Sequence, residues 1–289
     1  MERDFVLLIP GNPGIAGYYI PFLRYLKRSL LPHRADVFTC SYIGHTRQGL
    51  AGQQSKLYTL EQQVKHKVAL LSSHFLRPGR PPLLIFAHSI GAYIALHAVQ
   101  RLELAAASSQ DAASAPSLPP ILKVVALMPF LTVDPASRRQ RFLRGLAAYP
   151  RCLGAVAGML GLLPRWLKRR LVAGYAGNLG EHAVDASVGL LDAGAAANAF
   201  YLAQHEFREL AAPADWSLLQ RLGERILVLC AHEDMWMPLW KWDQMLKACP
   251  GIQAHIEPGQ THDFCVTLGG SKAMAERAAE DLRESLPAL

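Results

Sequence analysis

The stretch Leu83-Leu-Ile-Phe-Ala-His-Ser-Ile-Gly91 combines a short apolar run with a serine between small residues. The run Leu83–His88 predicts a buried strand, and the following residues, Gly91–Leu104, predict a helix. Between them, Ala87-His88-Ser89-Ile90-Gly91 is a relaxed form of the G-x-S-x-G motif, in which a sharp, strained turn holds the serine hydroxyl clear of the sheet. Ala87 replaces the first glycine and is expected to tighten the turn slightly. A serine in an ordinary helix N-terminus is the alternative, but the strand–turn–helix context favours the motif.

Outward from this stretch, short apolar runs alternate with longer helical patterns, which is typical of an α/β protein with a mostly parallel sheet flanked by helices. The predicted strands are Phe5–Ile9, Asp36–Ser41, Leu83–His88, Val124–Met128, Ile226–Cys230 and Gln253–Glu257. The predicted helices are Pro21–Leu31, Leu57–Leu76, Gly91–Leu104, Leu239–Ala248 and Lys272–Glu284. Residues 105–120, rich in Ala, Ser and Pro, predict a flexible surface connection.

The alternation breaks between residues 134 and 216, where the pattern is helical and without clear strands. We interpret this stretch as a helical cap inserted over the carboxyl edge of the sheet. The chain then divides into a first part of the core (1–133), the cap (134–216) and a second part of the core (217–289).

Two further polar residues follow predicted strands. Asp234 lies in the loop after Ile226-Leu-Val-Leu-Cys230, and His262 lies in the segment that follows the last strand. The order Ser89, Asp234, His262, each after a strand, is the order expected for the α/β-hydrolase fold. Glu233 is an alternative to Asp234, whereas His255, inside a strand, is expected to be a packed core histidine rather than the base.

These residue types suit nucleophilic catalysis. A serine hydroxyl is a weak nucleophile until an imidazole can take its proton, and a carboxylate fixes the tautomer of that imidazole. We therefore predict Ser89 as nucleophile, His262 as base and Asp234 as the orienting acid, with no metal and no cofactor.

The oxyanion of such a reaction needs preorganised N–H donors. The backbone N–H of Ile90, directly after the serine, is the first candidate. The second is the backbone N–H of Asn12 in the loop Ile9-Pro-Gly-Asn-Pro-Gly14, because Pro13 has no N–H to donate. A plain Gly/Pro turn is the alternative for this loop, and we favour the oxyanion role.

Composition excludes several classes of protein. The chain has 289 residues, 51% of them hydrophobic, which is enough for a sizeable core without disulfides or metals. Its 5 cysteines are odd in number and widely spaced, so neither a disulfide framework nor a zinc site is expected, and a reducing environment is favoured. The formal charge of +7 is local, because nine basic residues and no acidic residue lie between Pro135 and Gly180.

That basic stretch also contains an apolar segment, Phe142–Leu163, interrupted by Pro150 and Arg151 and therefore unsuited to a straight transmembrane helix. Cationic residues and Trp166 flank it, as in segments that dip into the headgroup level of a lipid monolayer. We predict membrane-surface association through residues 138–170. A lid with solvated arginines is the alternative, and the dense apolar residues argue against nucleic acid. For Trp236, Trp240 and Trp242, core packing and a lipid-facing rim are left open.

Several motifs together resemble the lipid droplet-associated hydrolase family. They are Ile9-Pro-Gly-Asn-Pro-Gly14, Tyr18-Tyr19-x-Pro-Phe22, Gly44-His45, Gln63-x-x-His66-Lys67, His88-Ser-Ile-Gly91 and Asp234-x-Trp-x-Pro238. The resemblance covers most of the chain. It implies a lipid ester hydrolase, with cholesteryl esters as the usual proposed substrate, on lipid droplets and the cytosolic face of the endoplasmic reticulum. It also maps the nucleophile, acid and base to Ser89, Asp234 and His262.

Because Phe5–Ile9 already predicts the strand before the oxyanion loop, we expect no signal peptide and no extra amino-terminal strands. Two other functions stay open. One is a small-molecule or thioester hydrolase, and the other is a droplet-bound scaffold whose triad is vestigial. Branches of the fold with a carboxylate nucleophile are disfavoured by Ser89.

Overall fold

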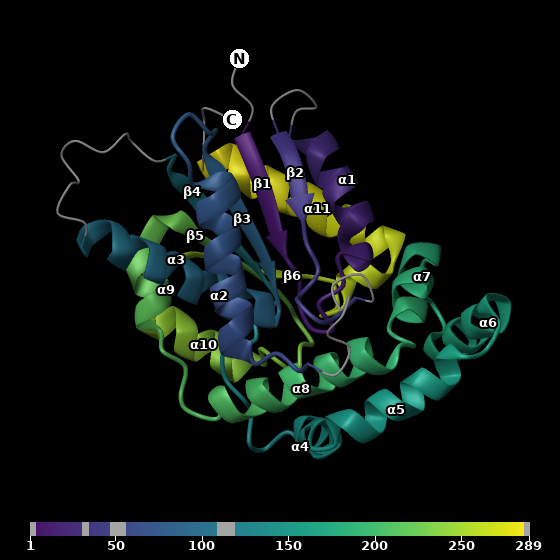
Figure 1. Cartoon of the computed structure of the whole chain (residues 1–289). Helices are drawn as coiled ribbons and strands as arrows, with labels where there is room; N and C mark the ends of the chain where they lie inside the picture. Colours follow the sequence, from purple (N-terminus) through teal and green to yellow (C-terminus); the bar gives the residue numbers. More distant parts are fainter. Residues whose placement is uncertain (1–3, 31–34, 47–55, 109–118, 286–289) are drawn as a thin grey trace.

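The protein is built around one parallel sheet. The computed structural model describes residues 4–30, 35–46, 56–108 and 119–285. Among them, six strands form a parallel sheet in the order β2-β1-β3-β4-β5-β6 (Figure 1). The strands are β1 (Asp4–Ile9), β2 (Ala35–Thr39), β3 (Leu83–His88), β4 (Ile121–Leu127), β5 (Ile226–Ala231) and β6 (Gln253–Glu257). All six predicted strands are present, with small differences at their ends. The central strands β1, β3, β4 and β5 are apolar runs that are mostly buried, whereas the edge strands β2 and β6 are partly exposed.

Helices cover both faces of the sheet (Figure 1). One face carries α2 (Leu60–Leu70, continued by a π-helix, Leu71–Phe75), α3 (Ile90–Ser108), α9 (Ser217–Leu222) and α10 (Leu239–Ala248). The other face carries α1 (Ile20–Ser29), preceded by the 3₁₀ turn η1 (Ala16–Tyr19), and α11 (Leu268–Ser285), preceded by η5 (Phe264–Val266). A short 3₁₀ turn, η4 (Gly223–Arg225), leads into β5. Residues 109–118 of the predicted surface connection lie outside the described residues.

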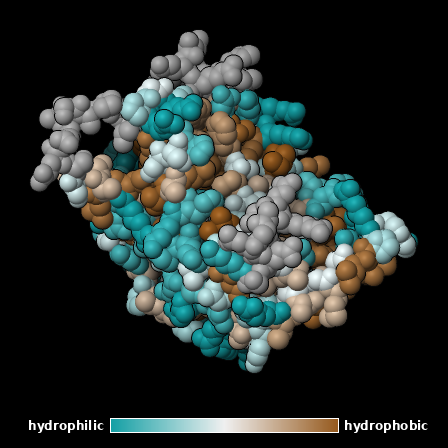
Figure 2. Space-filling view, in the orientation of Figure 1, coloured by the Kyte–Doolittle hydropathy of each residue, from teal (hydrophilic) through white to brown (hydrophobic). Residues whose placement is uncertain are grey.

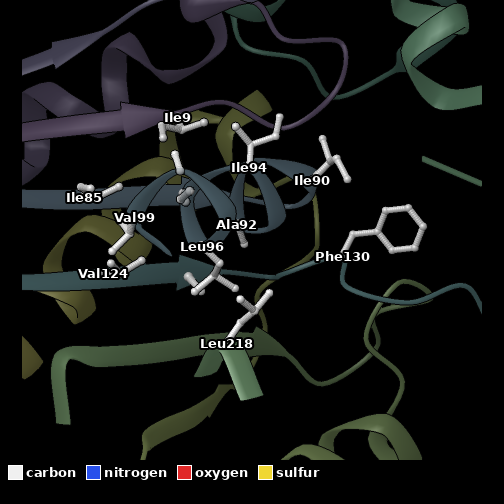
Figure 3. Packing of buried hydrophobic residues seen from close by; sticks show 14 of the residues in the cluster. Ile9, Ile85, Ile90, Ala92, Ile94, Leu96, Val99, Val124, Phe130 and Leu218 are labelled. Atoms are coloured by element: carbon white, nitrogen blue, oxygen red, sulfur yellow. The ribbon is translucent and has the colours of Figure 1, made fainter. Parts of the chain in front are cut away.

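The strand side chains alternate between two buried clusters. Leu7 and Ile85 belong to the cluster under α2 and α3, whereas Val6 and Phe86 belong to the cluster under α1 and α11. Figure 3 shows the first cluster, in which α3 sets its apolar side chains against β3 and β4. Full burial of one such large side chain stabilises the fold by about 1.5–3 kcal/mol. This packing fixes where α3 begins, and therefore where Ser89 lies.

Five α-helices lie in residues 134–216, between β4 and α9. They are α4 (Arg138–Ala147), α5 (Pro150–Gly161), α6 (Arg165–Ala176), α7 (Glu181–Gly189) and α8 (Ala193–Glu209). The described structure has no strand in residues 134–216, which we call the insertion. In Figure 1 the insertion lies beyond the arrowheads of the strands, across their carboxyl ends. The division into core and cap stays a prediction.

Within the insertion, α5 packs tightly against α8 through glycine. A Cβ atom at Gly154 would lie 2.5 Å from the carbonyl oxygen of Ala193, and one at Gly161 would lie 2.1 Å from that of Leu191. A Cβ at Gly158, between them, would lie 2.8 Å from the Cβ of Ala193. Glycines at these spacings share one helix face, so this face of α5 is a packing surface and only the opposite face is exposed. Among the described residues, no helix is both long and apolar enough to cross a membrane.

Candidate active site

Ser89 stands at the strained turn between β3 and α3. Its φ of 54° lies in the left-handed region, which is uncommon for a residue other than glycine. Gly91 is required two residues later, because a Cβ there would lie 2.4 Å from the carbonyl oxygen of Pro10 and 2.5 Å from that of Ile9. Ala87, which replaces the first glycine of the motif, is fully buried and pairs with Ile9 and Ala126 of the neighbouring strands. The core therefore accommodates its methyl group.

Three side chains that are far apart in the sequence meet at Ser89. The Nε2 atom of His262 lies 3.0 Å from the Oγ of Ser89, and its Nδ1 lies 2.8 Å from Oδ2 of Asp234. A carboxylate only accepts hydrogen bonds, so we assign the proton to Nδ1 and leave Nε2 free to accept from the serine hydroxyl. This is the tautomer that a general base for Ser89 requires.

The structure separates Asp234 from its neighbour Glu233. The side chain of Asp234 is fully buried, and its second oxygen, Oδ1, accepts from the backbone N–H of Trp236 at 2.8 Å. Glu233 is exposed. The geometry therefore brings Asp234 to His262; its catalytic role stays a prediction.

The loop after β1 lies directly against the serine. A Cβ at Gly11 would be 2.9 Å from the Cβ of Ser89, so only glycine permits this approach. Ile90 is the first residue of α3, and the first N–H groups of a helix have no partner within it. The loop of Asn12 and the start of α3 thus flank the hydroxyl, as an oxyanion hole requires, and the donor roles of Asn12 and Ile90 stay predictions.

The side chain of Asn12 is bound to the insertion. Its Nδ2 donates to the carbonyl oxygen of Ala199 at 2.9 Å and to Oε1 of Glu206 at 3.0 Å, both on α8. Burial raises the pKa of Glu206 to about 8, although the amide of Asn12 acts in the opposite direction, so this carboxyl is neutral at pH 7. Sequence reasoning did not find Glu206, because nothing local distinguishes it from other helical glutamates.

An aromatic group borders the three residues. The ring centroid of Trp236 lies 6.0 Å from that of His262 and 4.5 Å from that of Phe130. The ring of Phe207, on α8, lies 6.0 Å from Trp236 and 6.3 Å from Phe130, so the three rings form one cluster. Of the other two tryptophans, Trp242 is buried in the core and Trp240 is half-exposed. Core packing therefore holds for Trp242, whereas a lipid-facing rim at Trp240 stays a prediction.

The prediction that His255 is a packed core histidine is wrong. Its strand, β6, lies at the edge of the sheet, and the side chain is 43% exposed, with Nε2 3.6 Å from Oδ1 of Asp281. Burial depends on which strands flank a residue, and the strand's own pattern does not contain that information. Among the described residues, no group of three or more His, Cys, Asp or Glu side chains could hold a metal ion.

A parallel sheet with helices on both faces, and a serine on the tight turn at the carboxyl end of a central strand, define the α/β-hydrolase class. Comparison with solved structures confirms this fold. An α/β-hydrolase fold protein from Burkholderia ambifaria superposes with a TM-score of 0.60 at 15% identity, covering 96% of this chain and 90% of the other. A structure described in work on carboxylesterases of the thaumarchaeon Nitrososphaera gargenis superposes with a TM-score of 0.62 at 14% identity, covering 99% and 92%.

Sequence comparison identifies the family within this class. A model of the lipid-droplet associated hydrolase family matches residues 2–265, so the chain belongs to this family. The lipid droplet-associated hydrolase of Rattus norvegicus is 26% identical over 300 residues, covering 99% of this chain and 86% of the relative. The resemblance noted from the motifs is thereby confirmed.

Proposed function

We propose that this protein is a serine carboxylic ester hydrolase of lipid droplets, acting on cholesteryl esters or related neutral lipids. The observation that carries the proposal is the continuous pair of hydrogen bonds from Ser89 through His262 to Asp234, at 3.0 and 2.8 Å. The hydrolase family and its name support the droplet as the site of action. Residence at the endoplasmic reticulum stays a prediction from the resemblance.

The arrangement supports a two-step reaction. His262 takes the proton of Ser89 as the serine oxygen attacks the ester carbonyl carbon, and the imidazolium that forms is stabilised by Asp234. The negative oxygen of the tetrahedral intermediate accepts hydrogen bonds from the backbone N–H groups of Ile90 and Asn12. Removal of one such donor costs about 3 kcal/mol of transition-state stabilisation. His262 then protonates the departing alcohol, which leaves an acyl-serine. Water activated by the same imidazole releases the fatty acid and restores Ser89.

The surroundings of the serine favour an apolar substrate. Phe130 follows β4, and its backbone N–H donates to the carbonyl oxygen of Ser89 at 3.2 Å. The half-buried ring of Trp236 places aromatic surface beside the base, and the ring of Phe130, which is buried in the core, packs against it. Aromatic side chains bury large apolar groups well, so an acyl chain or a sterol ring fits here better than a polar ester would.

The insertion offers a surface for the droplet monolayer. Helices α4, α5 and α6 and the turns beside them expose large apolar side chains: Phe142, Tyr149, Val156, Met159, Leu160, Leu162, Trp166, Leu171 and Tyr175. Figure 2 shows that the surface over α5 is mostly pale to brown, that is, small or apolar, whereas the side below α2 is hydrophilic. An apolar strip of this kind on a surface helix suits insertion into an acyl layer.

The basic residues of the insertion divide into two groups. Arg165 and Arg169 form ion pairs with Asp185, and Arg169 also pairs with Glu181. The neighbouring Arg151 and Arg170 are exposed on the same helices, α5 and α6, as the apolar strip. The monolayer is therefore expected to meet fewer positive charges than the nine counted in the sequence, and apolar insertion is expected to dominate the binding.

The double change Met159→Asp and Leu162→Asp is expected to weaken binding to lipid droplets by at least about tenfold, because each side chain loses an apolar contact worth about 1.5–3 kcal/mol at full burial. Both residues are exposed, at 63% and 87%, so folding is unaffected. Flotation of purified protein with artificial droplets measures the bound fraction. Leu104→Asp on α3, 53% exposed, is the matched control and is expected to bind like the wild type. Deleting the whole segment is a poorer test, since α5 packs on α8.

Fluorophosphonate treatment of the purified protein is expected to give one covalent adduct, on Ser89, located by mass spectrometry of the proteolytic peptide. Emulsified cholesteryl and glyceryl esters are then assayed beside short-chain nitrophenyl esters and acyl thioesters. Faster turnover of the long-chain esters is expected, because the aromatic surface gains from each buried methylene. Exclusive turnover of short esters or thioesters would favour the small-molecule alternative. A protein with neither adduct nor turnover would be the scaffold.

A further inference from the structure

His88, the residue before the serine, takes part in a buried chain of hydrogen bonds. Its Nδ1 lies 2.7 Å from the hydroxyl oxygen of Tyr19, and its Nε2 lies 2.8 Å from the backbone carbonyl oxygen of His262. The same tyrosine oxygen accepts from the backbone N–H of Gly11 at 2.8 Å. His88 and Tyr19 are both buried. The chain thus joins the loop of Asn12, the serine turn and the loop of His262.

The geometry allows only one order of protons in this chain. The carbonyl oxygen of His262 can only accept, so Nε2 of His88 carries a proton and donates to it. In a neutral imidazole Nδ1 is then unprotonated and accepts from the hydroxyl of Tyr19. That leaves the tyrosine oxygen to accept from Gly11. Each proton in the hydrogen-bonded chain then has a defined acceptor, so the chain holds three loops in a single arrangement.

The surroundings keep both side chains in these states. Burial, with His262 close by, lowers the pKa of His88 well below its ordinary value, although its bond to the His262 carbonyl acts against this, so the imidazole stays neutral. Burial raises the pKa of Tyr19 well above its ordinary value, so the hydroxyl keeps the proton that it donates. Phe264 closes the other side of the imidazole, with ring centroids 5.2 Å apart.

Close packing adds to the hydrogen bonds. A Cβ at Gly11 would lie 2.8 Å from Nδ1 of His88, so the loop after β1 rests directly on the imidazole. In β3, His88 shares its face with Phe86 and Leu84, which belong to the cluster that also contains Tyr19 and Phe264. The alternation ends at Ser89, where the positive φ turns the chain out of the strand. The strand thus buries His88 while the turn presents Ser89 at the edge of the sheet.

We infer that His88 and Tyr19 are a pair of positioning residues, which hold the oxyanion loop and the base loop in register with Ser89. The inference rests on the proposed function, since the pair acts through Asn12 and His262. The hydrogen bonds of the pair go to the backbone of Gly11 and of His262 and not to Ser89 Oγ or Nε2 of His262, although the rings of His88 and His262 lie side by side, with centroids 5.0 Å apart. Their contribution is to fix the distance from His262 Nε2 to Ser89 Oγ and the approach of the Asn12 loop before substrate arrives.

The change Tyr19→Phe removes one hydroxyl and no packing, so it is the sharpest test. It leaves Nδ1 of His88 and the N–H of Gly11 without partners, and both loops are expected to shift. We expect kcat to fall by about ten- to a hundred-fold with little change in KM, because misplacement of reacting groups by about 1 Å has effects of this size. The matched control is Tyr18→Phe, which removes a buried hydroxyl that bonds to Ser187 at 2.7 Å. This hydroxyl is not part of the hydrogen-bonded chain through His88.

A second readout does not need turnover. The Nδ1 proton of His262, bonded to Asp234, is expected to give a low-field NMR resonance in the wild type and in Tyr18→Phe, and to broaden or move in Tyr19→Phe. The proposed function fails if the wild type neither hydrolyses esters nor forms the Ser89 adduct, and this resonance still tests the pair in that case. Equal effects of Tyr18→Phe and Tyr19→Phe on kcat or on the resonance would overturn the inference, as would no effect of Tyr19→Phe.

Changes at His88 provide a further check. In His88→Gln the side-chain amide can still donate to the carbonyl of His262, whereas in His88→Leu no donor remains. We expect the glutamine variant to retain at least about tenfold more activity than the leucine variant at equal folded fraction. Equal activities would contradict the positioning role. The leucine variant is compared only if its circular dichroism matches the wild type, and Tyr19→Phe decides the question if it does not.

Discussion

Changing Ser89 to alanine is expected to lower kcat on long-chain lipid esters by about a million-fold, the size of effect seen when the nucleophile of a triad is removed. Nε2 of His262 lies 3.0 Å from the hydroxyl oxygen of Ser89, and alanine has no group that could replace this hydroxyl. The turn itself is set by the packing of β3 and α3, so the fold is expected to persist. Steady-state kinetics and fluorophosphonate labelling measure the loss, and circular dichroism measures the fold.

Ser187→Ala is the control for this change, since it removes a hydroxyl of the insertion, on α7, that bonds to Tyr18 of η1. It is expected to leave kcat unchanged. Droplet binding is expected to be the same in both variants, because neither lies on the exposed strip of α5. A Ser89→Ala protein that retains more than about one hundredth of the wild-type rate would require another nucleophile. Effects on droplets that persist in this variant would support the scaffold alternative.

The change Asp234→Asn is expected to lower kcat by about ten-thousand-fold through the tautomer of His262. Oδ1 of Asp234 accepts from the N–H of Trp236 at 2.8 Å, so the amide oxygen of asparagine is expected to keep that position. Its Nδ2 then faces Nδ1 of His262, and two donors cannot share a hydrogen bond. The imidazole must place its proton on Nε2 instead, where it can no longer accept the proton of Ser89.

Glu233→Gln is the matched control, with the same chemical change one residue away on an exposed side chain. It is expected to leave kcat within about twofold of the wild type, since an exposed charge interacts weakly through water. The kcat of both variants on the same lipid ester decides the comparison. If Glu233→Gln lost as much activity as Asp234→Asn, the assignment of the acid would pass to Glu233.

The insertion contacts the candidate active site through α8. The side-chain amide of Asn12 donates hydrogen bonds to Ala199 and Glu206 of α8. The ring of Phe207, on the same helix, lies beside that of Trp236. The helix that carries these contacts also packs against α5, whose outer face carries the apolar strip. Helices α5 and α8 therefore lie between the surface proposed for the monolayer and the loop proposed for the oxyanion.

Much of the fold was predictable because its signals are local. A run such as Ile226–Ala231 is apolar throughout, since helices bury both faces of its strand, and such a run is visible without knowledge of its neighbours. The motif around Ser89 is equally local, because a tight turn restricts the size of the residues on either side of it. Parallel strands end at one edge, so three loops that follow strands were expected to converge, and Ser89, Asp234 and His262 do.

The tertiary structure decided what depends on distant neighbours. The orientation of the loop after β5 decides that Asp234, and not its neighbour Glu233, faces His262. The side chain of His255 is partly exposed because, among the described residues, no strand pairs with the outer side of β6. The glycine face of α5 could have been found from the spacing of Gly154, Gly158 and Gly161, but its partner, α8, could not. His88 and Tyr19 are separated by 69 positions, and their hydrogen bond exists only because strand and helix pack together. Local patterns thus determined the elements and the chemistry they carry, whereas contacts between distant segments decided which groups touch.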